Sequence, residues 1–315
     1  MTVLDSAPLD VLDAYRTCEF ATLGRDGTPL AWPTAVWRRP DGTLLLSTSL
    51  AFAQKALNIR RDPRVALLFS DPTGSGRTAP PQIFVGGLAE CPDEIMTGPR
   101  GAEDYWRMLF ERQPHSRSYL LPPLRPLMDW YYLRLLITVT PRQVVVRPQL
   151  PASESPAATL ALAQAQAPAR AGGLVGAAQL ARFPTAVLAA RDARGAPVLA
   201  RTRPRPTAGG FAVDVPADCA AAPGPAALLV HRHDERLNHM HNALVRGELR
   251  EGDAGPVLVP AKVVEPMGSG RAADAVSVLR ATRRATDRYL SRRGLPRPRV
   301  RWQEFRSLAR DARRT

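Results

Sequence analysis

The sequence is short of lysine, of cysteine pairs and of long apolar runs, and each shortage limits what the protein can be. Only two of its 43 basic residues are lysines, Lys55 and Lys262, so arginine supplies nearly all of the positive charge. The three cysteines are far apart and form no CxxC pair, which argues against a zinc ribbon or a disulfide scaffold and favours a reducing, cytoplasmic location. No apolar run approaches about 18 residues, so we expect no membrane span. Residues 1–10 also lack the basic and apolar regions of a secretory signal.

Length and charge indicate more than one domain and an uneven surface. A chain of 315 residues with 45% hydrophobic residues is long enough for two cores. The formal net charge is +14, and residues 268–315 hold 14 arginines against 4 acidic residues. Such a tail could attract nucleic acid, which is one possible reading of the protein. Apolar residues recur in it at helical spacing, however, so we expect a helical tail over 267–315 that docks on the rest of the chain, and nucleic acid is not the expected partner.

The first part of the chain, residues 1–148, consists mainly of short apolar runs joined by tight turns. Asp26-Gly27 and Asp41-Gly42 are turn sequences between such runs, which predicts strands connected as hairpins. Many short strands with few helices favour a small barrel over a doubly wound sheet. Residues 149–173 are rich in proline, alanine, serine and glutamine and are predicted to be a linker.

Residues 174–266 repeat the plan of the first part in a degenerate form. Five segments recur in the same order, which chance would not readily produce. The first-part segments are 22–31, 44–49, 65–71, 84–90 and 139–148, and their counterparts are 187–200, 211–216, 226–234, 244–251 and 258–266.

The segment TLLLSTSLAFAQKALNIRRDPRVALLFSD, residues 43–71, is predicted to contain the binding site. It indicates a strand, a turn with Ser47, Thr48 and Ser49, a helix over 54–61, and a second strand. Hydroxyl and amide groups at a strand end, beside a helix that carries Lys55, can hold a phosphate group. A solvated lysine on a helix surface is the alternative. The second copy has only alanine, proline and Asp218-Cys219 here, so we expect one site per chain.

Three stretches carry a resemblance to a known family: ATLGRDGTPLAWPTAVW, LLLSTS and KALNIRRDPRVALLFSD. They resemble the split-barrel flavin-binding superfamily of pyridoxamine 5'-phosphate oxidase-like proteins. The last stretch is most similar to the branch that uses a deazaflavin, coenzyme F-420, and FMN-using relatives are also similar. The resemblance covers residues 8–148, and extends to 174–266 only through the internal repeat.

The resemblance implies a mainly β (α+β) fold of two split β-barrels in tandem, which form an intramolecular pseudo-dimer with the cofactor at their seam. The protein would be a monomeric pseudo-dimer or a homodimer. It would be an FMN- or deazaflavin-dependent oxidoreductase that transfers hydride to a small conjugated substrate, with no protein nucleophile required. The residues expected on the phosphate side are Ser47, Thr48, Ser49, Lys55 and Asn58, and those expected along the ring are Pro33, Thr34, Ala35 and Val36.

A histidine cluster supports a rival reading. Four of the five histidines lie within eleven residues: His231, His233, His239 and His241. On two strands joined by a turn they could bind zinc, copper, nickel or haem, and some split-barrel relatives bind haem. They could equally be polar side chains along the seam. A non-catalytic binding protein, associated with nucleic acid through the tail, is a further alternative.

Overall fold

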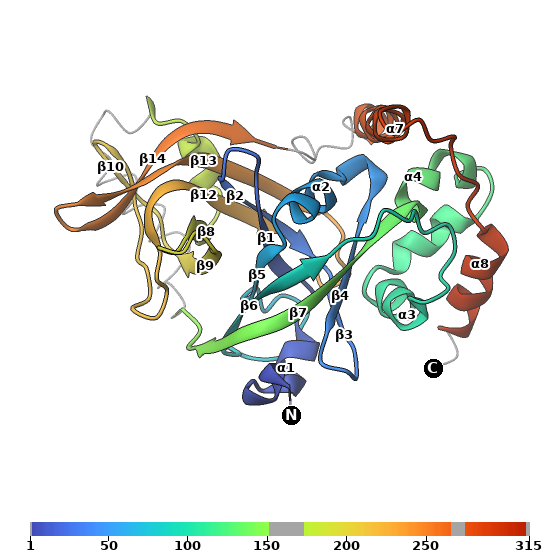
Figure 1. The fold of residues 1–315 in the computed structure, drawn as a ribbon, viewed down its shortest axis with the longest axis horizontal. Helices are drawn as coiled ribbons and strands as arrows, with labels where there is room; N and C mark the ends of the chain where they lie inside the picture. The colour runs from blue at the N-terminus through green and yellow to red at the C-terminus, as the bar shows by residue number, and fades with distance from the viewer. Residues whose placement is uncertain (1, 151–172, 266–274, 313–315) are drawn as a thin grey trace.

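The computed structural model describes residues 2–150, 173–265 and 275–312 (Figure 1). The predicted linker lies almost wholly outside the described residues, as does the start of the predicted tail. In the part that is described, the chain forms two antiparallel sheets of seven strands each, together with helices that gather around the first sheet.

The first sheet holds the strands of the first copy in the order β2-β1-β5-β6-β7-β4-β3. Its strands are β1 (Cys18–Leu23), β2 (Pro29–Thr34), β3 (Trp37–Arg38), β4 (Leu44–Ser49), β5 (Arg64–Phe69), β6 (Gln82–Glu90) and β7 (Arg134–Arg147). Strand β7 is one continuous strand of 14 residues, although it contains Pro141. Pro141 is tolerated because it lies at an irregularity in the ladder, opposite Gly87.

The second sheet repeats this topology strand for strand. Its order is β9-β8-β12-β13-β14-β11-β10, which is the order of the first sheet with seven added to every number. Its strands are β8 (Ala186–Arg191), β9 (Pro197–Thr202), β10 (Arg205–Thr207), β11 (Gly210–Ala212), β12 (Ala222–Arg232), β13 (His241–Gly252) and β14 (Gly255–Val264). The predicted mainly β fold with two copies of one plan is therefore confirmed.

The repeat extends to single residues of the ladder. Gly87 pairs with Pro141 at the irregularity between β6 and β7, and Gly247 pairs with Pro260 at the same place between β13 and β14. A Cβ atom on Gly247 would lie 2.0 Å from the carbonyl oxygen of Val259, so the bulge requires glycine.

β1 and β4 are buried at every residue and β5 at all but its first, although β1 also carries Glu19 and Thr22, and β4 carries Ser47–Ser49. In β1 and β5, apolar side chains alternate between the interior of the first copy and a second apolar surface. One cluster of buried residues fills the first copy and another fills the second copy. A third cluster joins the two sheets, and Ala21, Leu68, Val187 and Leu229 belong to it. A strand that is covered on both faces has no solvent-exposed side, so it need not alternate apolar with polar residues.

The two copies face each other by reciprocal contacts. Strand β2 of the first copy packs against β8 and β12 of the second, while β9 of the second packs against β1 and β5 of the first. Contacts that exchange in this way define a pseudo-two-fold relationship, like the isologous interface of a dimer. The predicted intramolecular pseudo-dimer is thus the arrangement that the structure has.

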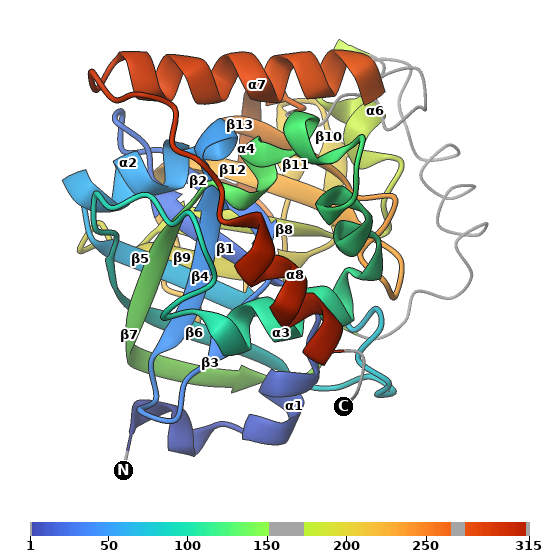
Figure 2. The ribbon, with the colours of Figure 1, turned by 90° about the vertical axis from the view of Figure 1, so that its right-hand side faces the viewer.

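Most helices surround the first sheet (Figure 2). The helices are α1 (Leu9–Ala14), α2 (Gln54–Arg61), α3 (Glu103–Arg112), α4 (Asp129–Tyr132), α6 (Ala177–Leu180), α7 (Ala275–Ser291) and α8 (Trp302–Asp311), with short 3-10 helices η1 (Val3–Ser6), η2 (Leu50–Phe52), η3 (Pro114–Leu120) and η4 (Arg125–Leu127). Helix α2 has the bounds that the sequence predicts and connects β4 with β5. In the second copy, all residues between β11 and β12 are described, and they contain no helix.

The tail docks on the first copy through its apolar residues. Helix α7 packs on η2, and α8 packs on α3 and η3. The Phe305 ring lies 4.7 Å from the Trp106 ring, and both side chains are fully buried. Arg297 hydrogen bonds to both carboxylate oxygens of Asp129. No helix among the described residues has the length and apolar character needed to cross a membrane.

Candidate functional site

A cavity of about 470 Å³ lies where the two copies meet. The first copy contributes β2, β4 and the helical insert between β6 and β7, and the second copy contributes the turn that connects β12 with β13. Cavities of roughly 300–1,000 Å³ are typical of small-molecule sites. The lining residues are Thr17, Trp32–Ala35, Ser47–Ser49, Phe52, Lys55, Tyr105, Leu109, Gln113, His115, Tyr119, Trp130, Tyr131, Arg134 and Leu237–Asn242.

Seven of the nine residues predicted for the cofactor line this cavity. They are Pro33, Thr34, Ala35, Ser47, Thr48, Ser49 and Lys55. The structure does not bring the other two into the lining. Val36 is buried in the core of the first copy. Asn58 is fully buried and donates a hydrogen bond of 2.9 Å to Thr22, because it lies one helical turn beyond Lys55 and deeper against β1.

Lys55 is a buried cation without an acidic partner. Its side chain belongs to a residue that is only 9% exposed, and within the described residues no carboxylate forms an ion pair with it. The Nζ atom instead lies 5.3 Å from the centroid of the Trp32 ring. Burial, helped by the charge of Arg134, lowers the pKa of Lys55 to about 8. An unpaired buried ammonium group is costly, and an anionic ligand in the cavity would offset that cost.

Arg134 is a second cation in the cavity, and the sequence analysis missed it. Its guanidinium donates a hydrogen bond of 2.9 Å to Ser47 and lies 4.5 Å from the centroid of the Tyr131 ring. Ser47 in turn donates to the Tyr105 hydroxyl at 3.0 Å. A guanidinium fixed on a ring face and a hydroxyl is well oriented to bind a phosphate or carboxylate.

Several polar atoms in the lining are buried without a hydrogen-bond partner. This group consists of Ser49 Oγ, Trp130 Nε1, His115 Nδ1, both ring nitrogens of His241 and Asn242 Oδ1. Buried polar groups are normally satisfied, so a cluster of unsatisfied donors and acceptors around one cavity indicates a polar ligand. The Thr48 hydroxyl is not available, because it donates to the Phe52 carbonyl at 2.8 Å.

The structure separates the four clustered histidines into two pairs. His239 and His241 line the cavity, with the His241 ring stacked 5.9 Å from the Phe183 ring. His231 and His233 lie outside the lining, with their rings 6.2 Å apart. The pairs separate because β12 ends at Arg232, before the intervening turn, and β13 starts at His241. A single four-histidine centre is therefore not formed.

A second cavity of about 600 Å³ adjoins the first and shares Trp32, Phe52 and Asn242 with it. Its walls include apolar side chains of β2 and β13, and α7 covers it. Arg288 and Arg292 line it from the side of α7. A ligand bound in the first cavity would therefore lie next to the second cavity.

The corresponding place in the second copy is not suited to an anion. Val139 and Leu258 are equivalent, because each lies two residues before the proline of the repeated irregularity. Leu44 pairs with Val139, and Phe211 pairs with Leu258. Asp214, three residues after Phe211, therefore corresponds to Ser47, three residues after Leu44. Asp214 forms hydrogen bonds of 2.6 and 2.8 Å with Arg205. A carboxylate at this position would repel a phosphate.

Comparisons with known proteins found similarity only among solved structures. A scan against protein-family models and a search of curated proteins gave no match. A pyridoxamine 5'-phosphate oxidase-related, FMN binding protein from Nostoc punctiforme is 17% identical, with 46% of this chain and 83% of that chain covered and a TM-score of 0.33. An F420 reductase is 26% identical, with 43% and 93% covered and a TM-score of 0.30. The heme storage protein HutZ from Vibrio cholerae is 14% identical, with 47% and 96% covered and a TM-score of 0.30.

Each of these three matches is partial and has a low TM-score. Each covers less than half of this chain, which corresponds to about one copy. At these TM-scores they add no weight to any of the cofactors, so any assignment of function depends on the cavity itself.

Proposed function

We propose that this protein binds FMN or deazaflavin coenzyme F-420 in the seam cavity, and that it is an oxidoreductase that transfers hydride to a small conjugated substrate. The observation that carries the proposal is the buried, unpaired ammonium group of Lys55, which lies in a cavity with Arg134 and without a lining carboxylate. Both cofactors have a phosphate group, which needs cations and hydroxyl donors.

The residues of the cavity fit such a cofactor. Lys55, Arg134 and Ser49 would hold the phosphate, since Ser49 Oγ is buried and has no other partner. Trp32–Ala35 would lie along the ring, where the backbone of β2 can address its polar edge. When bound, a flavin-type group supplies the hydride chemistry, and the protein binds, orients and excludes water.

The second cavity would admit the substrate. It opens beside Trp32 and Phe52, which line both cavities. Its walls combine four arginines (Arg246, Arg288, Arg292 and Arg293) with apolar side chains, and the apolar part suits a planar or conjugated molecule. We also propose that one chain is sufficient for the site, because the first copy supplies the cations and the second copy supplies Leu237–Asn242. Light scattering on the purified chain would test this, and we expect a monomer to bind the cofactor.

The binding proposal can be tested with the untagged protein. Its absorbance spectrum is recorded directly after purification, and FMN, deazaflavin and haem are then titrated in separate experiments. We expect one of the two flavin-type cofactors to bind with a stoichiometry of one per chain. Binding of neither would refute the proposal, and a Soret band with haem alone would replace it with the haem reading through His239 or His241.

A matched pair of variants ties binding to the site. Lys55→Met should weaken cofactor binding by about 10- to 150-fold, because a hydrogen bond to a charged group contributes about 1.5–3 kcal/mol. Lys262→Met removes the other lysine, which is exposed on β14, and should leave the affinity unchanged. Equal affinities for the two variants would show that the ligand lies elsewhere.

A further inference from the structure

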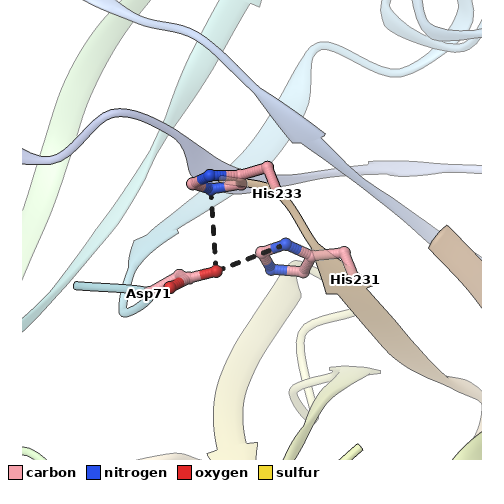
Figure 3. A group of neighbouring side chains, drawn as sticks. All are labelled: Asp71, His231 and His233. Carbon is pink, nitrogen blue, oxygen red and sulfur yellow. Dashed lines mark ion pairs between the residues drawn. The ribbon is translucent and has the colours of Figure 1, made fainter. Parts of the chain in front are cut away.

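A second group of polar side chains lies at the seam, outside the lining of the cavity (Figure 3). Asp71 follows β5 of the first copy, His231 is near the end of β12, and His233 follows that strand. The side chains of His231 and His233 are 2% and 0% exposed, and that of Asp71 is 14% exposed. One oxygen of Asp71 lies 3.7 Å from His231 Nδ1 and 3.6 Å from His233 Nε2.

The outer nitrogen of each imidazole is already held by a group that accepts hydrogen bonds. His233 Nδ1 lies 2.9 Å from the carbonyl oxygen of Asp234, and His231 Nε2 lies 2.7 Å from Glu19 Oε1. Glu19 itself receives hydrogen bonds from Arg201 and Ser70, so its carboxylate is an acceptor. The outer nitrogens are therefore placed to donate, and a ring that carries its proton there would turn a lone pair inward.

Three possible ligand atoms thus converge on one point. The carboxylate oxygen of Asp71 faces the inner nitrogens of both histidines, as Figure 3 shows. His231 Nδ1 is buried without any hydrogen-bond partner. The inner nitrogen of His233 has the Thr17 hydroxyl at 3.1 Å, whereas that of His231 has no partner, so a cation would satisfy His231 Nδ1 and the Asp71 oxygen that faces it.

We propose that Asp71, His231 and His233 bind a divalent first-row transition-metal ion, with Zn²⁺ as the leading candidate. Two imidazole nitrogens and one carboxylate oxygen form a donor set that suits this class of ion. Ligand atoms that surround a tetrahedral metal at about 2.0–2.1 Å lie about 3.3 Å from one another. The ligand atoms here lie within 4.8 Å of one another, so a small inward movement completes the site.

The surroundings match those of metal ligands in general. A ligating histidine usually donates its other ring nitrogen to a carboxylate or a backbone carbonyl, which fixes the tautomer. Here His231 has the carboxylate of Glu19 and His233 has the carbonyl of Asp234. One ligand comes from the first copy and two come from the second, so the ion would clamp the pseudo-dimer at its seam.

The site is independent of the proposed cofactor but close to it. Thr17 Oγ1 lies 3.1 Å from His233 Nε2, and Thr17 lines the cavity. The metal would therefore lie one side chain away from the ligand in the cavity, without contacting the lysine site.

Metal binding can be measured on the untagged full chain after removal of metals with a chelator. Zn²⁺ is added in a calorimetric titration, and Co²⁺ is added in parallel because its visible absorption reports the coordination geometry. We expect one ion per chain, a Co²⁺ spectrum of a four- or five-coordinate site, and a higher melting temperature with metal than without. No saturable binding, or a melting temperature that rises only on acidification, would overturn the proposal and leave a protonated histidine as the cation.

Three variants locate the ion. Asp71→Asn and His231→Gln should each lower the Zn²⁺ affinity by at least about tenfold, in line with the loss of one ligand. His239→Gln is the matched control, since His239 is an exposed histidine of the same turn, and it should keep the wild-type affinity. Circular dichroism checks that each variant is folded. Unchanged affinity in both ligand variants, or an equal loss in His239→Gln, would contradict the assignment.

Discussion

The carboxylate of Glu19 lies 2.7 Å from the guanidinium of Arg201, and this ion pair joins the two copies across a buried seam. Glu19 pairs with Pro33 in the first sheet, and the equivalent pair in the second sheet is Val187 with Arg201. The pseudo-two-fold relationship would thus place Val187 against Pro33. Glu19 belongs to the first copy and Arg201 to the second, and the equivalent residues Val187 and Pro33 cannot form an ion pair. At this position the two copies are therefore complementary and not interchangeable.

Removal of one partner from this pair should destabilise the whole protein. Glu19→Ala would leave Arg201 and His231 buried without their carboxylate, and we expect a loss of about 3–5 kcal/mol in the free energy of unfolding. Urea denaturation measures this. Asp214→Ala breaks the exposed pair with Arg205 and should cost no more than about 1 kcal/mol. Similar losses of unfolding free energy for the two variants would show that the buried Glu19–Arg201 pair contributes no more to stability than the exposed pair.

The same pair makes the stability depend on pH in a defined direction. Burial alone would raise the pKa of Glu19, but Arg201 together with His231 and Ser70 outweighs it, so the pKa lies below its ordinary value of 4.5. A lowered carboxyl pKa gives stability that is present above 4.5 and is lost as the pH falls toward the folded-state pKa. Acid denaturation of wild type and Glu19→Gln should therefore converge at low pH. Parallel curves would assign the acid sensitivity to other groups.

The affinity for a phosphate-bearing cofactor should fall as the pH rises through the pKa of Lys55, which burial lowers to about 8. An anion binds to the protonated amine, so deprotonation weakens binding by up to about tenfold per pH unit above that value. Fluorescence titrations one unit below and one unit above pH 8 measure the effect. Lys55→Arg provides the control, because arginine remains charged and the dependence should flatten. A wild-type affinity that does not change over this range would exclude Lys55 from the phosphate site.

Much of the fold could be predicted because the repeat and the local patterns agree. Helix α2 has its predicted bounds because Asp62-Pro63 stops it, and the row Ser47–Ser49 lines the cavity because a strand end carries it there. Arg134 and Tyr105 could not be found in this way. Tyr105 belongs to the insert between β6 and β7, and Arg134 is the first residue of β7, where that insert ends. The insert has no counterpart in the second copy, and its sequence does not say which part of the first sheet it covers. Asn58 was expected at the site because the family resemblance implies it there, whereas the structure buries it against Thr22 of β1.

The glycines of the repeated bulge offer a test of the packing with an internal control. A Cβ atom on Gly87 would lie 2.6 Å from the carbonyl oxygen of Thr140, whereas the nearest atom to a Cβ on Gly86 is a side-chain carbon at 3.5 Å. Gly87→Ala should destabilise the protein by about 1–3 kcal/mol, because backbone must move. Gly86→Ala should change the free energy of unfolding by much less. Urea denaturation compares the two, and equal effects would mean that the bulge is not rigid.

The docking of α8 depends on Phe305, which lies 4.7 Å from the ring of Trp106 and is fully buried. Phe305→Ala would create a cavity, and such substitutions cost about 3–5 kcal/mol. If the cost exceeds what holds α8 in place, the helix detaches and water reaches Trp106, which shifts the tryptophan fluorescence to the red. Gln303→Ala on the exposed side of the same helix is the control and should leave the spectrum unchanged. A spectrum of Phe305→Ala like that of wild type, with an unchanged urea midpoint, would show that the arginine contacts and not the aromatic packing hold the tail.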